Sequence, residues 1–209
     1  MRKTMKTRSS AELRVVALLL ALGMAGLLTT PPAIGQEKFV VKPLAEKKLA
    51  QLPAGPLYWR IENFATLAQA QAAADSTSLA AEADGKAWLF TLGAKGGATA
   101  GGHEVAEIGP IPRIAAASYL LRVNRATGGP GAKTPVHSHP GSETFYVLSG
   151  RLGEKTPRGV MQVEAGQAMP GQALGTPMEA LGSGPNALDA LVMFVVDATR
   201  PFSSPEKFE

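Results

Sequence analysis

Short stretches in which apolar and polar residues alternate recur along most of the chain after residue 57. Alternation with a period of two is typical of β-strands with one buried face, and the Gly- and Pro-rich segments between them are typical of turns. The stretches that we expect to form strands are residues 58–62, 87–92, 118–124, 144–148, 159–164 and 188–196. Many short strands joined by such turns predict an all-β fold, either a sandwich or a jelly-roll barrel.

The stretch at residues 188–196 differs from the others because both of its faces are apolar. One face carries Leu188, Ala190, Val192, Phe194 and Val196, and the other carries Leu191, Met193 and Val195. A strand that is apolar on both sides is buried on both sides. We therefore expect one face to line a barrel and the other to be covered, either by the N-terminal segment or by a second subunit in a homodimer.

The segment between residues 36 and 84 predicts an N-terminal extension with a short helix. Residues 36–57 combine Lys and Glu with three prolines, so we expect an arm without a core of its own. Residues 65–74 are rich in Ala and Gln, which favours a helix, with Asn63 as a candidate cap. The Gly-rich residues 93–102 lack the Gly-Lys-Ser/Thr ending that grips a nucleotide, so we expect a loop without that function.

Residues 1–35 have the three parts of a secretory signal peptide. A basic segment precedes about fourteen apolar residues from Val15 to Leu28, and prolines then interrupt the run. Small residues at Ala33 and Gly35 predict cleavage before Gln36. The apolar run is short for a membrane span. We expect a periplasmic or secreted protein without stable membrane association after cleavage, with an uncleaved anchor as the alternative.

The charge of the chain is concentrated in that signal segment. The formal net charge is +4, but residues 36–209 contain 16 Lys and Arg against 16 Asp and Glu. A neutral domain offers no electrostatic attraction for nucleic acid, so we expect none as a partner. The chain has no cysteine, which excludes disulfides and suits an oxidising compartment.

His137, His139 and Glu143 are the strongest candidates for chemistry. On an extended strand, residues two apart point to the same side, so both imidazoles can aim at one point. The turn at residues 140–142 can then bring Glu143 to the same point. Two imidazoles and one carboxylate form a three-ligand face for one divalent transition metal, and iron, manganese, nickel, copper and zinc all accept this set.

The spacing around these residues resembles the first conserved motif of the cupin superfamily. Gly131, His137, His139, Glu143 and Gly150 match that motif at every fixed position. The resemblance implies one cupin domain of the type-2 kind, a jelly-roll barrel over residues 85–200, followed by a C-terminal tail at 201–209. It also implies that the two histidines and the glutamate are metal ligands.

The second cupin motif is only partly present. It normally supplies one more histidine ligand, but no histidine follows His139 in this chain. Met178 occupies that position by alignment, whereas a strict count from Gly166 reaches Pro177, so the position is ambiguous by one residue. We expect Met178 to fill space in the core, with an axial copper ligand as the alternative.

Neighbouring residues complete the picture of the site. Phe145 and Val147 share a strand face with Glu143 and should form an apolar wall, whereas Tyr146 should point away. We expect Lys133 and Arg151 to be solvated loop charges, with binding of an anionic substrate as the alternative. The last candidate, His103, should be a surface or structural residue.

Two functions remain open at this stage. The first is an exported metal-dependent enzyme, in particular a dioxygenase-type oxidoreductase that acts on a small organic substrate. The alternative is a non-catalytic module that binds a small ligand or a metal in the same cavity. Fold alone does not choose between them.

Overall fold

A computed structural model describes residues 38–208 as an all-β protein with fourteen strands and one short helix. The fold class predicted from the alternating pattern is therefore confirmed. The predicted signal peptide, its cleavage point before Gln36 and residue 209 of the tail lie outside the described residues. Within the described part, no helix is both long and apolar enough to span a membrane.

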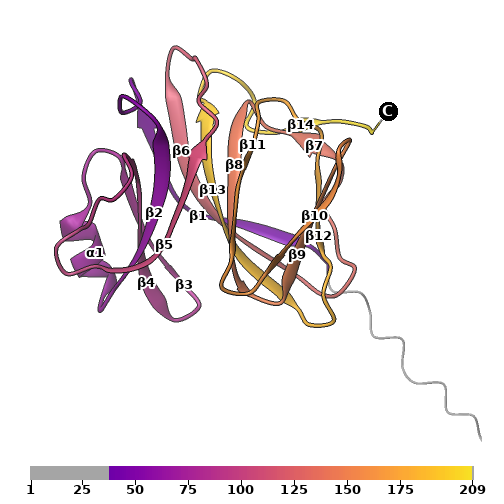
Figure 1. Ribbon diagram of the computed structural model, residues 1–209, viewed down its shortest axis with the longest axis horizontal. Helices are drawn as coiled ribbons and strands as arrows, with labels where there is room; N and C mark the ends of the chain where they lie inside the picture. The colour runs from indigo at the N-terminus through magenta and orange to yellow at the C-terminus, as the bar shows by residue number, and fades with distance from the viewer. Residues whose placement is uncertain (1–37, 209) are drawn as a thin grey trace, which may run out of the picture. The chain divides into compact units, whose positions relative to one another are not determined.

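The central sheet has five antiparallel strands and contains the strand that is apolar on both faces (Figure 1). Its order is β1 (Val40–Leu49), β6 (Tyr119–Gly128), β13 (Leu188–Asp197), β8 (Gly141–Ser149) and β11 (Ala168–Gln172). Strand β13 lies in the middle, between β6 and β8. Both of its faces are buried, as the sequence predicts.

A second sheet of four strands covers one face of β13. Its order is β3 (Ser78–Ala83), β4 (Lys86–Gly93), β2 (Leu57–Phe64) and β5 (His103–Ile111). Leu191, Met193 and Val195 of β13 pack in one core with Trp88 and Phe90 of β4. The cover is thus intramolecular, and most of its strands come from the predicted N-terminal extension and the residues just after it.

The expected helix is present as α1 (Leu67–Ala73), two residues inside the predicted start. Its cap is Thr66, whose hydroxyl accepts a hydrogen bond from the Gln69 N–H at 3.2 Å. The prediction of Asn63 as the cap was wrong, because Asn63 still belongs to β2 and pairs with Trp88. The helix buries Ala70 in a small cluster against Leu89.

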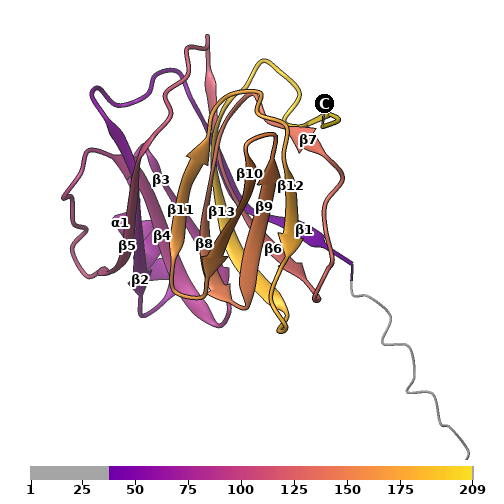
Figure 2. The same ribbon diagram turned by 45° about the vertical axis from the view of Figure 1, so that its right-hand side comes forward.

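The other face of β13 lines the jelly-roll barrel. Figure 1 shows β9, β10 and β12 facing the central sheet on the side away from the four-stranded sheet. These strands are β9 (Arg151–Thr156), β10 (Gly159–Glu164) and β12 (Glu179–Gly182), in the order β10-β9-β12. A two-stranded pair joins β7 (His137–Ser138) and β14 (Ser204–Pro205), which Figure 1 labels side by side. Figure 2 shows β7 close to the C-terminus. Leu188, Val192 and Phe194 of β13 face this interior.

The N-terminal arm pairs with the central sheet, which the sequence did not indicate. Residues 40–49 form the edge strand β1 along β6, and the pairing register shifts between Pro43 and Ala45. Proline has no N–H to donate to a neighbouring strand. It is therefore tolerated at an edge strand and at such a bulge, where the ladder of hydrogen bonds does not need that donor. The arm has no core of its own, as expected, but Phe39 packs against the barrel core.

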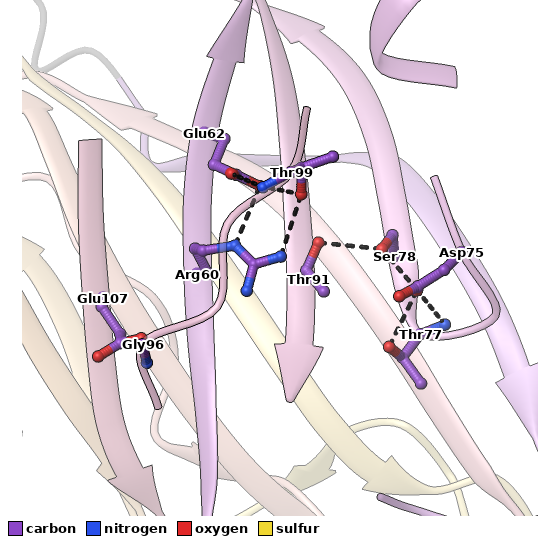
Figure 3. A network of polar contacts seen from close by, with 9 residues as sticks. All are labelled: Arg60, Glu62, Asp75, Thr77, Ser78, Thr91, Gly96, Thr99 and Glu107. Atoms are coloured by element: carbon purple, nitrogen blue, oxygen red, sulfur yellow. Dashed lines mark hydrogen bonds and ion pairs between the residues drawn. The ribbon is translucent and has the colours of Figure 1, made fainter. Parts of the chain in front are cut away.

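The Gly-rich loop after β4 is tied to the four-stranded sheet by carboxylates (Figure 3). Glu62 is buried and accepts hydrogen bonds from the N–H and the hydroxyl of Thr99, at 2.8 and 2.7 Å. Arg60 lies 3.1 Å from the same carboxylate, and the Gly96 N–H donates to Glu107 at 2.6 Å. Glu107 and Glu62 therefore accept hydrogen bonds from the backbone N–H groups of Gly96 and Thr99 in this loop.

Two glycines with the same backbone conformation allow a matched test of the packing around the first motif. Gly150 has φ +71° and a β-carbon there would lie 2.3 Å from the Ala187 carbonyl oxygen, whereas Gly166 has φ +78° and open space. Gly166→Ala should cost about 1–2 kcal/mol for the left-handed conformation alone. Gly150→Ala should cost about 1–3 kcal/mol more, because the carbonyl must move. Denaturant unfolding measures both, and equal costs would contradict the close packing.

Candidate metal centre

The three candidate ligands converge on one point inside the barrel. His137 is in β7, His139 follows that strand directly, and Glu143 is the third residue of β8. One possible ligand atom from each lies within 4.8 Å of the other two. The two imidazole rings stand at 88° to each other with centroids 5.0 Å apart. The turn between His139 and Glu143 is shorter than the predicted turn at residues 140–142, because strand β8 already begins at Gly141.

Backbone carbonyls fix the orientation of both imidazoles. His137 Nδ1 lies 2.8 Å from the Pro135 carbonyl oxygen, and His139 Nδ1 lies 2.6 Å from that of Phe202. A carbonyl only accepts, so each Nδ1 must carry the proton and donate it. In the neutral form of each ring, Nε2 then keeps a free lone pair, which is the arrangement found in metal-binding histidines.

Burial disfavours the charged forms of two of the three candidate ligands, His139 and Glu143. His139 is buried, and desolvation lowers its pKa to about 4 despite the hydrogen bond to Phe202. Burial, and secondarily the nearby Glu154 carboxylate, raise the pKa of Glu143 well above its ordinary value. The 3.8 Å approach of His139 Nε2 to Glu143 Oε2 is therefore not an ion pair at neutral pH, because the imidazole carries no charge.

The donor set fits a divalent cation. Glu143 Oε2 is buried and has no hydrogen-bond partner among the described residues. A buried carboxylate without a partner is costly, and a metal ion would offset that cost. Two imidazole lone pairs and this oxygen supply three ligands of the types that transition metals accept. His137, His139 and Glu143 are thus the residues that could hold the ion.

The three candidate ligands lie in the wall of a cavity of about 430 Å³. Its surface is mainly apolar and rich in aromatic rings. Four phenylalanines from four different segments take part, namely Phe39, Phe145, Phe194 and Phe202. Besides the three ligands, the polar side chains in the wall are those of Asn124, Thr134 and Ser203. A cavity of this size and polarity is suited to a small organic molecule.

Phe145 and Tyr146 take the places predicted from the strand pattern, whereas Val147 does not belong to the described lining of the cavity. Phe145 lines the cavity, Val147 is buried in the barrel core, and Tyr146 packs in the opposite core with Trp88. His103 is exposed at the start of β5.

The two basic residues near the motif are not part of the cavity wall. Lys133 is largely exposed and lies 3.1 Å from Glu179, and Arg151 lies 3.5 Å from Glu164. Lys133 agrees with the expectation of a solvated charge, whereas Arg151 is half-buried at the start of β9 and was wrongly placed in a loop.

Strand pairing places Met178, rather than Pro177, opposite His137. Met169 pairs with Phe145 and Gln172 with Glu143, so three steps along β11 match two steps along β8. This one-residue bulge shifts the count from Gly166. Met178, not Pro177, then forms a bridge with His137 through backbone hydrogen bonds of 2.9 and 2.8 Å.

Met178 itself is fully buried, with 1% of its surface exposed. It does not belong to the residues that line the cavity, among those that the structure describes. Both observations favour the packing role over that of an axial ligand.

The chain ends contribute to the site in a way that the sequence did not reveal. Phe39 and Val41 from the N-terminal arm, and Phe202, Ser203 and Pro205 from the predicted tail, line the cavity. The Phe202 ring also packs against the rings of His139 and Phe194, with ring centroids 4.8 and 4.9 Å apart. The signal in the sequence was the presence of two aromatic residues, Phe202 and Phe208, in a tail of nine residues.

A second buried carboxyl group, Glu154, was also missed. Its Oε2 accepts a hydrogen bond from Gln172 at 2.6 Å, and Gln172 accepts one from the exposed Arg158 at 3.0 Å. Its Oε1 is buried without a partner. Burial raises the pKa of Glu154 to about 7. The signal in the sequence was its position two residues after Leu152, which places both side chains on the inner face of β9.

The central part of the chain matches a known family. Residues 125–170 match the model of the cupin domain, and this segment contains all three candidate ligands. The match supports the cupin superfamily that the first motif suggested. No curated protein matches the chain.

Several solved structures overlap parts of the chain. A DMSP lyase is 22% identical with a TM-score of 0.37, over 42% of this chain and 44% of its own. A polyketide cyclase from Streptomyces resistomycificus is 22% identical with a TM-score of 0.36, over 43% of this chain and 62% of its own. A conserved protein from Klebsiella pneumoniae with a double-stranded β-helix domain is 27% identical with a TM-score of 0.36, over 42% of this chain and 76% of its own. The overlap thus spans less than two thirds of the lyase and of the cyclase.

The raised pKa of Glu154 predicts a pH-dependent stability in the metal-free protein. The folded protein holds this proton more tightly than the unfolded chain, so the stabilisation is complete below pH 4.5 and is lost as pH rises to about 7. The shift corresponds to about 3 kcal/mol. Glu154→Gln keeps an acceptor for Gln172 and removes the titration. Its free energy of unfolding should therefore fall less over this range than that of the wild type.

Denaturant unfolding at several pH values provides the measurement. Glu164→Gln, at a well-exposed carboxylate on β10, is the control and should follow the wild type. Parallel pH profiles for wild type and Glu154→Gln would show that the buried carboxyl has no such effect.

Proposed function

We propose that this chain is an exported cupin protein that binds one divalent transition metal and acts as a dioxygenase-type oxidoreductase on a small organic substrate. One observation carries the proposal. Two imidazoles with free Nε2 lone pairs and one unpartnered carboxylate oxygen meet in the wall of an apolar cavity. Protein atoms alone give no reason for this arrangement, whereas a metal ion next to a bound organic molecule does.

The ion would be held by His137, His139 and Glu143, and it would supply Lewis-acid and redox chemistry at the cavity wall. The residues of the chain would prepare the site for it. The Pro135 and Phe202 carbonyls hold the two rings in the required tautomer and orientation. Phe145, Phe194 and Phe202 would hold the apolar part of a substrate and exclude water.

A non-catalytic binding module is the second candidate, and one observation favours it. Apart from the three proposed ligands, the described wall of the cavity contains no acid, lysine, histidine or tyrosine that could serve as a general base. An oxidoreductase can rely on its metal for the chemistry, but a reaction that needs a separate proton acceptor would lack one at the wall.

Metal content and oxygen uptake together test the proposal. Wild-type protein should bind about one transition-metal ion per chain. His137→Ala/His139→Ala should bind none, because one remaining ligand cannot hold an ion against water. His103→Ala, at the exposed histidine, is the matched control and should bind as the wild type does.

Elemental analysis measures the metal, and an oxygen electrode then measures turnover with a panel of phenols and diketones. Equal metal content in wild type and the double variant would refute the metal site. Metal binding without oxygen uptake on any substrate would favour the binding module.

Export is a separate part of the proposal and rests on the basic, apolar and small-residue segments of residues 1–35. The mature chain should begin at or near Gln36 and reside in the periplasm or outside the cell. Intact mass and N-terminal sequencing of the protein from its native cells provide the test. A mature chain that still begins at Met1 would refute cleavage.

A further inference from the structure

The cavity contains a polar side chain that the proposed metal site does not use. Asn124 lies on β6, where Leu121 and Val123 face the core between the sheets and Ala126 faces the barrel. The alternation of the strand turns Asn124 to the same side as Ala126, and both line the cavity. Asn124 is 2% exposed, and its Oδ1 has no hydrogen-bond partner among the described residues.

Nothing on the neighbouring strands satisfies this amide. Asn124 pairs in register with Pro43 on β1 and with Val192 on β13, and neither side chain can donate a hydrogen bond. A buried amide that the fold leaves unpaired is normally selected against, because its desolvation is not repaid. A ligand in the cavity would provide the missing partner.

The rest of the wall restricts the chemistry of such a ligand. No lysine or arginine belongs to the described lining of the cavity. Arg122, two residues before Asn124 on β6, lies over the Phe202 ring at 4.4 Å and donates to Glu46 at 2.9 Å. An anionic group bound at Asn124 in the metal-free protein would therefore lose its hydration without gaining a cationic side chain of the cavity wall. The four phenylalanine rings favour an aromatic or alicyclic skeleton.

We propose that the cavity binds a neutral, ring-containing molecule whose hydroxyl group forms a hydrogen bond with the amide of Asn124. This inference rests on the proposed function, because the molecule would be the ligand or substrate of the same cavity. Asn124 is then a residue that determines specificity, because a site built to bond a hydroxyl discriminates strongly against an analogue that lacks it.

The test compares three probes of one shape: 4-ethylphenol, its methyl ether 4-ethylanisole, and the anion 4-ethylbenzoate. Isothermal titration calorimetry of metal-free protein at neutral pH should give a dissociation constant for the phenol about tenfold lower than for the ether or the anion. Asn124→Leu, which keeps the branching of the side chain, should bind the phenol only as well as the ether. Its affinity for the ether should remain that of the wild type.

Two variants guard against effects on folding. Asn186→Leu makes the same exchange at an exposed turn and should keep the preference for the phenol. Asn124→Ala should lose the preference in the same way if the leucine variant fails to fold. The melting temperature of Asn124→Leu should equal or exceed that of the wild type, because the exchange removes an unpaired amide. A lower value together with a retained preference would assign Asn124 a structural role and overturn the proposal.

The outcomes separate this inference from the proposed function. Equal binding of phenol and ether by the wild type, binding of the benzoate as tight as that of the phenol, or binding of none of the three would overturn the inference even if the protein holds a metal. A preference for the phenol that depends on Asn124 would support it even if His137→Ala/His139→Ala proved the metal assignment wrong.

Discussion

The burial of β13 on both faces is the constraint on which the rest of the structure depends. Its side chains alternate between two separate cores, one between the two large sheets and one inside the barrel. Removing both faces from water requires a layer on each side. The four-stranded sheet provides one layer. The other layer consists of β9, β10 and β12. The interior of this barrel is not completely filled, and it contains the cavity and the candidate metal centre.

The candidate centre combines an apolar surrounding with groups whose charge has been suppressed. Burial keeps His139 neutral and favours the protonated form of Glu143, and Glu154 adds a second carboxyl group to the same interior. A divalent cation reverses this balance, since it attracts the Glu143 carboxylate and needs neutral imidazoles. Metal binding should therefore lower the pKa of Glu143.

Much of this arrangement could be predicted from the sequence, and the part that could not has a common cause. Alternation located β10 and β13 to within one residue, and the spacing of His137, His139 and Glu143 placed the three ligands together. Both are local patterns. The strand in the N-terminal arm, the carbonyl of Phe202 and the chain from Glu154 to Arg158 depend on partners far away in the sequence. Met178 illustrates the difference between local and distant information. Its count from Gly166 is shifted by the bulge in β11, and that bulge is defined only by the pairing of β11 with β8.

The contribution of Phe202 and Pro205 has a consequence for the biogenesis of the protein. The cavity includes Phe39 near one end of the described chain and Pro205 near the other, and the proton on His139 Nδ1 is held by the Phe202 carbonyl. The three candidate ligands come from residues 137–143, but the ring of His139 is oriented only when the segment around Phe202 has packed against it. A chain whose last described segment has not yet packed therefore lacks one of the two carbonyls that orient the imidazoles. Any ion that this site selects would be selected after both ends of the described chain have met around the cavity.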